Sequence, residues 1–322
     1  MKGVFKKRPA GTHLLVRMSA AIIILAAVLH GAFLRPAGVD ATIFPTFPSI
    51  PTFTIIDPSL WPVNIPDANL NAFLHVKCGK PMSEPLTRGD LAGLTGTLNI
   101  EGKGIANLEG IQFCRNIEIL NAIDNPLSNL PNMSGMTGLN DLWLRNCQFT
   151  SVPAGIASIP NLDYLDMAMN QITSITGLSG STSLRSVNLE QNRLSSLPDP
   201  LILPNLTSII ISGNSFDTFP LSIISLPSLV MLNISRNNIR DLPDEIASMP
   251  NLQTLIASRN KIRAIPASFG SSKIKVLFLA GNRIRTLPPA LFDSAYLKAL
   301  DVNLNRLTKI GRASCRGRVL FS

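Results

Sequence analysis

Few side chains in this 322-residue sequence have the type and spacing that catalysis requires. Histidine is the side chain best suited to carry protons near neutral pH, and the sequence contains only His13, His30 and His75. Because the first two lie in the basic and apolar N-terminal region, a serine–histidine or cysteine–histidine pair in the main body would depend on His75 alone. We expect His75 to lie on the surface of a short helix, outside any active site.

The usual metal-binding and phosphate-binding motifs are also missing from the sequence. It contains no C-x-x-C, no H-E-x-x-H, no phosphate-binding glycine loop and no calcium-loop spacing. Cysteines occur at positions 78, 114, 147 and 315, without the paired spacing of a disulfide framework. We therefore predict that the protein is not an enzyme and that it holds no cofactor and no metal.

The polar residue that does recur is asparagine, which returns every 22 or 23 residues through most of the chain. The same apolar frame surrounds each one, for example Leu229, Leu232, Ile234, Asn237, Ile239 and Leu242. This is L-x-x-L-x-L-x-x-N-x-L, the pattern of the leucine-rich repeat. The turn position of ten successive repeats is occupied by Lys103, Asn125, Cys147, Asn170, Asn192, Asn214, Asn237, Asn260, Asn282 and Asn305.

The repeat pattern predicts an α/β solenoid. The L-x-L alternation is typical of a short strand whose leucines face inward, and stacked repeats then form a parallel sheet on the concave side over a continuous core. At each turn, the asparagine amide can satisfy backbone groups that the turn leaves unpaired, so we interpret this ladder as structural. Proline follows most turns, as in Leu242-Pro243, so only short helical or 3₁₀ segments, such as residues 244–248, are expected on the convex side.

The first 41 residues have the features of a signal peptide. Basic residues precede an apolar run over residues 20–34, and small residues before position 42 allow cleavage after Ala41. The run is short for a membrane span, so an uncleaved anchor is the less favoured alternative. Residues 42–66 contain six prolines and are expected to form an extended linker. Its aromatic side chains either dock on the solenoid or, as we favour, simply accompany the spacer.

Residues 67–94 are expected to form a small helical cap at the N-terminal end of the repeats. Asp67 can cap one helix and Thr87 a second, and the apolar residues of both would cover the open end of the core. The ten repeats then occupy residues 95–309. Residues 310–322 break the pattern abruptly, without a capping element, and resemble a non-native tail. We expect the native chain to continue beyond this point.

The net charge of +9 is concentrated at the two ends of the chain. Residues 1–41 contribute +5 and residues 311–322 contribute +3, which leaves +1 for the rest. This balance gives no reason to expect nucleic acid as a partner, and membrane contact would come only from an uncleaved signal or a missing C-terminal anchor. A basic cluster in the last repeats is expected to be a solvated edge, with an anionic ligand such as a glycan or acidic protein as the alternative. Its members are Arg236, Arg259, Lys261, Arg263, Arg283, Arg285 and Arg306.

The outward strand positions form the concave face, where we expect a ligand to bind. Trp143 has Asp141 and Arg145 beside it on its own strand, and Tyr164 and Asp166 follow on the next strand. Exposed aromatic side chains beside charges are typical of interface hot spots. Other outward apolar residues are weaker candidates, because they can also simply pack against one another. These are Ile210, Met231, Ile256 and Phe278.

Three N-terminal motifs resemble those of bacterial internalin-type leucine-rich repeat proteins. They are Ile65-Pro-Asp-Ala-Asn-Leu70, Leu86-Thr-Arg-Gly-Asp-Leu91 and Gly104-Ile-Ala-Asn-Leu-Glu-Gly-Ile111. The later L-P-x-x-I segments depart from this family toward the common 23-residue repeat. The resemblance implies binding of a protein or glycan partner on the concave face, and together with the predicted signal it indicates a secreted or cell-surface protein. Two alternatives stay open: the recognition module of a larger enzyme, such as a ubiquitin-ligase-type effector whose catalytic domain is missing, or a purely structural scaffold.

Overall fold

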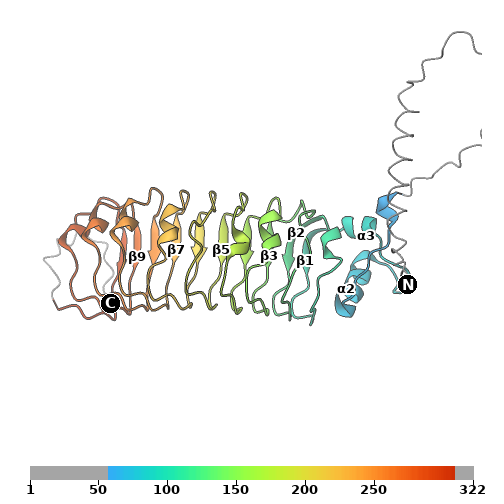
Figure 1. Ribbon diagram of the computed structural model, residues 1–322, viewed down its shortest axis with the longest axis horizontal. Helices are drawn as coiled ribbons and strands as arrows, with labels where there is room; N and C mark the ends of the chain where they lie inside the picture. Colours follow the sequence, from blue (N-terminus) through green and yellow to red (C-terminus); the bar gives the residue numbers. More distant parts are fainter. Residues whose placement is uncertain (1–56, 309–322) are drawn as a thin grey trace, which may run out of the picture. The chain divides into compact units, whose positions relative to one another are not determined.

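Ten short strands pair in sequence order into one parallel sheet (Figure 1). The structure is a computed structural model and describes residues 57–308. The strands are β1 Thr95–Asn99, β2 Asn116–Asn121, β3 Asp141–Trp143, β4 Tyr164–Asp166, β5 Ser186–Asn188, β6 Ser208–Ile210, β7 Met231–Asn233, β8 Thr254–Ile256, β9 Val276–Phe278 and β10 Ala299–Asp301. Each repeat supplies one strand, which confirms the predicted leucine-rich repeat solenoid. The predicted signal peptide (1–41), residues 42–56 of the predicted linker and the predicted tail (310–322) lie outside the described residues.

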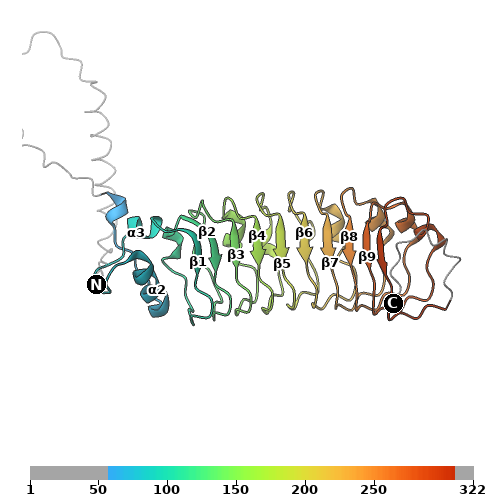
Figure 2. The same ribbon diagram turned by 180° about the vertical axis from the view of Figure 1, so that it is seen from behind.

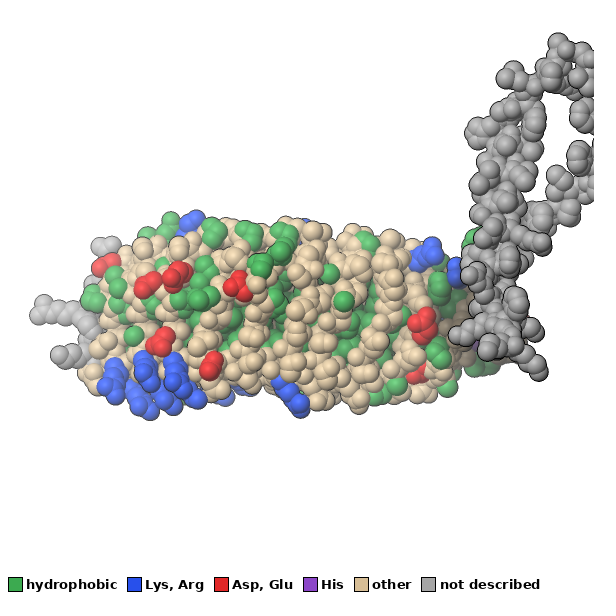
Figure 3. Space-filling model, viewed as in Figure 1, with side chains coloured by type: hydrophobic (Ala, Val, Ile, Leu, Met, Phe, Trp, Pro, Cys, Tyr) green, Lys and Arg blue, Asp and Glu red, His purple; other side chains and the backbone are tan. Residues whose placement is uncertain are grey.

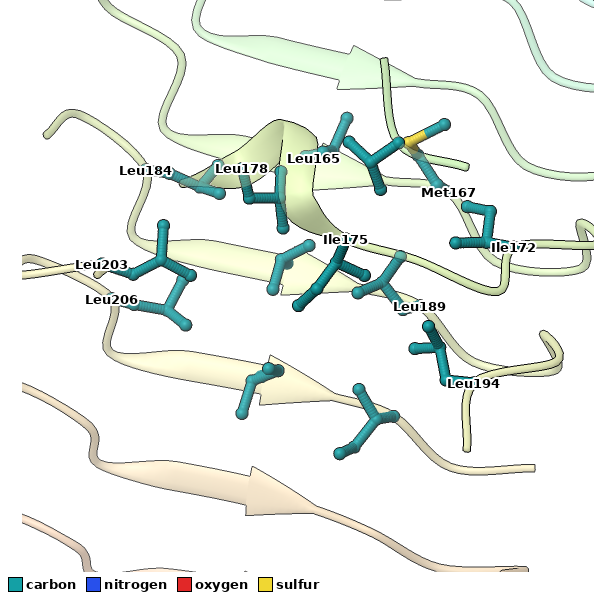
Figure 4. Close-up of a cluster of buried hydrophobic side chains, with 14 of the residues drawn as sticks. Leu165, Met167, Ile172, Ile175, Leu178, Leu184, Leu189, Leu194, Leu203 and Leu206 are labelled. Atoms are coloured by element: carbon teal, nitrogen blue, oxygen red, sulfur yellow. The ribbon is translucent and has the colours of Figure 1, made fainter. Parts of the chain in front are cut away.

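Strand register aligns the inward apolar positions of successive repeats. The central residue of each three-residue strand is buried between two partly exposed or polar neighbours, as Leu142 is in β3. Leu142 pairs with Leu165 of β4, which in turn pairs with Val187 of β5. Figure 4 shows the result, a continuous stack of side chains that includes Leu165, Leu189 and Leu206. Burying one large apolar side chain stabilises the fold by about 1.5–3 kcal/mol, and the sum of these contributions is the main force holding the repeats together.

The convex side consists of short 3₁₀ segments. They are η2 Ile111–Phe113, η3 Ala154–Ser158, η4 Thr176–Leu178, η5 Leu221–Ser225, η6 Asp244–Ser248, η7 Ala267–Ser271 and η8 Pro289–Leu291. Five of them, η3 and η5 to η8, directly follow a proline, which fixes φ for the start of the segment and has no N–H to leave unpaired. The predicted segment over residues 244–248 is confirmed with the same bounds.

The recurring asparagines hold the turns in the way that the pattern predicts. In the seventh repeat, Asn237 Nδ2 lies 3.0–3.1 Å from the carbonyl oxygens of Ile211, Ile234 and Ser235, and its Oδ1 accepts the N–H of Phe216 at 3.1 Å. The other seven asparagines make equivalent bonds. Cys147 is also buried, but its thiol reaches two carbonyl oxygens only at 3.6 and 3.7 Å.

The two cap helices are present where the sequence predicts them. Helix α2 (Ala68–Cys78) begins after Asp67, and α3 (Arg88–Ala92) begins after Thr87, which forms a capping box with Asp90. Their buried leucines lie against the first repeat, at the end of the stack seen in Figure 1. Within residues 57–308, no helix is both long enough and apolar enough to cross a membrane.

One expectation for this region is wrong. His75 is only 5% exposed, and its two ring nitrogens lie 2.9 Å from the carbonyl oxygens of Asn71 and Glu84. The loop that follows α2 folds back and covers the ring, which local sequence does not reveal. His75 therefore links this loop to the helix, and neither of its nitrogens faces a nucleophile.

The end of the predicted linker is docked on the cap. Residues Pro58–Leu60 form the 3₁₀ segment η1, and Val63 N–H donates to the Leu86 carbonyl oxygen at 2.8 Å. The guanidinium of Arg88 lies between the rings of Trp61 and Phe113, 4.9 and 4.7 Å from their centroids. For Trp61, the expectation that we favoured, an aromatic side chain that merely accompanies a spacer, is wrong. The backbone pairing and the cation–π contact with Arg88 fix this ring on the cap.

Candidate binding surface on the concave face

The strand register places the outward positions of the strands in two columns across the sheet. The sheet itself faces the viewer in Figure 2. The first column contains Thr97, Ile119, Asp141, Tyr164, Ser186, Ser208, Met231, Thr254, Val276 and Ala299. The second contains Asn99, Asn121, Trp143, Asp166, Asn188, Ile210, Asn233, Ile256, Phe278 and Asp301. We call this surface the concave face.

Eight of the nine candidate ligand-binding residues lie in these columns, and the ninth, Arg145, lies two residues after the end of β3. They divide into an N-terminal group on β3 and β4 and a C-terminal group on β6 to β9. In the first group Trp143 lies opposite Asp166, and Tyr164 lies opposite Asp141, so the two aromatic side chains are diagonal neighbours. The second group is Ile210, Met231, Ile256 and Phe278, of which only Ile256 and Phe278 are directly opposed.

The second column contains a polar ladder that the sequence analysis missed. Six of its side chains accept the backbone N–H of the residue two positions ahead, with distances between 2.9 and 3.1 Å. Such Asx turns stabilise the end of each strand. The residues are Asn99, Asn121, Asp166, Asn188, Asn233 and Asp301. The sequence does contain a signal that could have predicted this ladder, because each of the six is an Asn or Asp four residues before a turn position.

Apolar side chains replace the polar ladder at four positions of the second column. Trp143, Ile210, Ile256 and Phe278 cannot form the Asx turn, and all four are partly exposed. At these positions the strand end therefore lacks the Asx-turn hydrogen bond, and a partly exposed apolar side chain takes its place. Large apolar groups on a rigid sheet, with polar neighbours, are the composition of a binding surface.

Two charged side chains of the N-terminal group, Arg145 and Asp166, form an ion pair with each other. Arg145 Nε lies 3.3 Å from Asp166 Oδ2, while Asp166 Oδ1 accepts the N–H of Ala168 at 2.9 Å. Burial, followed by the Asp166 charge, raises the pKa of Tyr164, so its phenol stays protonated at neutral pH. Burial and then the Asp163 carboxylate raise the pKa of Asp141. Trp143 is unusual, because its buried Nε1–H has no hydrogen-bond partner.

A polar hollow of about 520 Å³ opens beside the N-terminal group, at the start of strands β3 to β6. It shares Asp141 with the candidate surface, and an ion pair between Arg185 and Asp163, with 3.4 Å between Nε and Oδ1, lies in its wall. The other lining residues are Asn140, Asn161, Thr182, Ser183 and Asn205. The sequence pattern gave no signal for this hollow. Within residues 57–308, no group of three or more His, Cys, Asp or Glu side chains is placed to bind a metal ion.

Comparison with known families identifies the repeats. A model described as "Leucine rich repeat" matches residues 204–262, and one described as "Leucine Rich repeats (2 copies)" matches residues 137–180. A comparison with curated proteins finds no match.

Solved structures of similar fold include two internalins from Listeria monocytogenes. Internalin C2 is 26% identical, with 74% of this chain and 94% of that chain covered and a TM-score of 0.54. A second internalin (inlF) is 21% identical, with 77% and 86% covered and a TM-score of 0.51. The Drosophila Toll–Spätzle complex shares the fold at 23% identity, with 65% of this chain and 29% of that chain covered and a TM-score of 0.56. The repeat matches and the ten-stranded parallel sheet show that this chain is a leucine-rich repeat solenoid, and its fold is similar to that of the internalins along most of internalin C2.

Proposed function

We propose that this chain is a secreted or cell-surface protein that binds a protein partner through its concave face. The observation that carries this proposal is the replacement of the polar ladder by Trp143, Ile210, Ile256 and Phe278, which are partly exposed on the sheet. Large apolar side chains in a polar surround form the core of protein interfaces. One matched structure is that of a Toll–Spätzle complex, which supports a partner-binding role for this kind of solenoid.

Trp143 and Tyr164 are the proposed centre of this surface. They lie diagonally across β3 and β4, and the protonated phenol of Tyr164 can both donate and accept a hydrogen bond. Arg145 and Asp166 already pair with each other, so their role is to position the surface around the aromatic side chains. A glycan is the second candidate partner, which the polar hollow at Asn140 and Asp141 favours.

Secretion rests on the first 41 residues and can be tested by itself. Expression of the full chain in a bacterial host should deliver the protein outside the cytoplasm with Thr42 as its first residue, because small residues precede this bond. N-terminal sequencing of the exported protein measures the cleavage position. Retention of Met1 on an exported, membrane-bound product would favour the uncleaved anchor.

The binding proposal is tested with an array of purified extracellular proteins and glycans. The Trp61→Phe variant leaves Trp143 as the only tryptophan, so a partner on the concave face should change its fluorescence. Loss of a central hot spot costs about 2 kcal/mol, so the double variant Trp143→Ala/Tyr164→Ala should bind about 30-fold more weakly. The control is Leu221→Ala, which removes an exposed apolar side chain from η5 on the convex side.

The outcomes separate the alternatives. A partner that binds the double variant as tightly as the wild type places its site elsewhere and removes the assignment of Trp143 and Tyr164. Binding only to glycans, with sensitivity to Asn140→Ala, replaces the protein partner by a sugar in the polar hollow. A chain that binds nothing on the array supports the scaffold alternative.

A further inference from the structure

Basic side chains gather at one edge of the solenoid near its C-terminal end (Figure 3). Lys261, Arg283 and Arg306 each follow a turn asparagine and form one column of this edge. Their backbone N–H groups donate to carbonyl oxygens of the preceding repeat at 2.8–2.9 Å, which holds the column in register. Because this pairing resembles that of a sheet, successive side chains start about 5 Å apart.

Two further columns flank the first. Arg240, Arg263 and Arg285 lie two residues farther along each repeat, and Arg263 N–H donates to the Arg240 carbonyl oxygen at 3.2 Å. Arg236 and Arg259 directly precede the turn asparagines. We call these eight residues the basic edge. The sequence-based cluster omitted Arg240, although it lies three residues after Asn237 just as Arg263 lies three residues after Asn260.

Two of the arginines occupy a backbone conformation that arginine disfavours. Arg236 and Arg259 have φ of 54° and 56°, in the left-handed region where glycine, asparagine and aspartate are preferred. The corresponding residues of the repeats on either side are Gly213 and Gly281, with φ of 67° and 71°. A Cβ at Gly281 would lie 3.3 Å from Cγ of Arg259, so the glycine leaves room for the arginine stem. The position has positive φ in every repeat, including Met169, Gln191 and Leu304, so the repeat turn imposes this conformation and the arginines are tolerated in it.

Within the described residues no acidic side chain pairs with the basic edge, although Asp217 and Asp241 occupy neighbouring positions. In residues 57–308, none of its eight side chains forms an ion pair or a side-chain hydrogen bond, and the three ion pairs of this part of the chain lie elsewhere. Most earlier repeats carry neutral or acidic residues at the matching positions, such as Asp124, Asn146 and Gln148, although Arg193 follows Asn192 in the same way. An unneutralised cluster of like charges attracts anions from solution.

We propose that the basic edge binds a linear anionic polysaccharide, at a site separate from the concave face. Seven of its eight residues are arginines, whose planar guanidinium groups bind sulfate and carboxylate groups with two parallel hydrogen bonds. Regular spacing from repeat to repeat matches a polymer with regularly repeated charges. The eight residues include no aromatic side chain, so the edge lacks both the anchor of a protein interface and the stacking platform of a single-stranded nucleic acid.

The test uses the full chain on immobilised heparin with a NaCl gradient. The double variant Arg236→Asn/Arg259→Asn removes two charges and places a residue that tolerates positive φ at both turns. We expect it to elute at a NaCl concentration lower by about 0.1 M or more, since fewer ion contacts form, while its unfolding midpoint is unchanged or higher. The matched control Arg115→Asn/Lys298→Asn removes the same charge at two exposed positions outside the basic edge and should elute close to the wild type.

Two results would overturn the proposal. One is equal elution shifts for the double variant and its control, which would show that heparin senses only net charge. The other is binding of polyglutamate or duplex DNA as tightly as heparin at the same NaCl concentration, which would remove the preference for a polysaccharide. The concave-face variant Trp143→Ala/Tyr164→Ala should elute like the wild type, so this test stands or fails independently of the proposed protein partner.

Discussion

At the scale of single residues, Asp67 joins the cap to the first repeat. Its Oδ1 accepts the N–H groups of Asn69 and Leu70 at the start of α2, both at 3.0 Å. Its Oδ2 accepts those of Ala106 and Asn107, at 2.8 and 3.1 Å, in the turn region of the first repeat. Burial alone would raise the pKa of Asp67, but these four hydrogen bonds lower it overall. The carboxylate is therefore both a helix cap and a tether.

We predict that Asp67→Asn lowers stability by about 1 kcal/mol at neutral pH, because the amide has no charge to strengthen these hydrogen bonds and only one oxygen to accept them. Because the native pKa is depressed, the carboxylate contributes fully above the unfolded value near 4, and its contribution disappears as pH falls through the native value. Urea unfolding of wild type and variant should therefore differ at pH 7 and converge at about pH 2.5. A difference that stays constant in acid would show that the charge of Asp67 does not matter.

At the scale of elements, neighbouring 3₁₀ segments pack so closely that some positions accept only glycine. A Cβ added to Gly177 of η4 would collide with the backbone oxygen of Val152 and would lie 2.6 Å from that of Pro153, at the start of η3. Gly155, inside η3, has no atom within 4 Å of the same hypothetical Cβ. Alanine at Gly177 therefore tests close packing, whereas alanine at Gly155 tests only the conformational freedom of the backbone, and both positions lie on the convex side of the solenoid.

Gly177→Ala should destabilise the protein by about 1–3 kcal/mol, because one extra methyl group forces the backbone of adjacent repeats apart. The matched change Gly155→Ala should be neutral or stabilising by up to about 1 kcal/mol, since it only restricts the unfolded chain. Thermal unfolding by circular dichroism compares the two. Equal effects would mean that η3 and η4 do not pack as closely as the structure shows.

Sequence predicts elements well here because each signal is local and repeated. The strand phase, the turn ladder at Asn237 and the segment over residues 244–248 all follow from spacing within one repeat. The sequence did not predict the burial of His75, which depends on the carbonyl of Glu84 after a chain reversal. On the concave face, period-two alternation predicts which side chains point outward, but not that Asp166 is bound to Arg145 and to its own backbone.

At the scale of the whole molecule, stability is nearly one-dimensional. Each repeat of a solenoid contacts mainly its neighbours, so local damage should spread along the stack only as far as neighbouring interfaces fail. Asn237 connects two such neighbours, because it bonds Ile211 and Phe216 of the sixth repeat and Ile234 of its own. Its loss would leave several buried backbone groups unpaired, at about 1–3 kcal/mol each.

We therefore expect Asn237→Ala to open the solenoid locally. Hydrogen exchange followed by mass spectrometry should show faster exchange in β6 to β8, while α2 and β1 to β3 keep the protection of the wild type, since their neighbours are intact. Asn238→Ala serves as the control, because this exposed residue uses only its backbone N–H, which donates to the Phe216 carbonyl oxygen at 2.7 Å. If exchange instead accelerates equally in all ten strands, the stack unfolds as a single cooperative unit, and coupling between repeats exceeds the stability of any one of them.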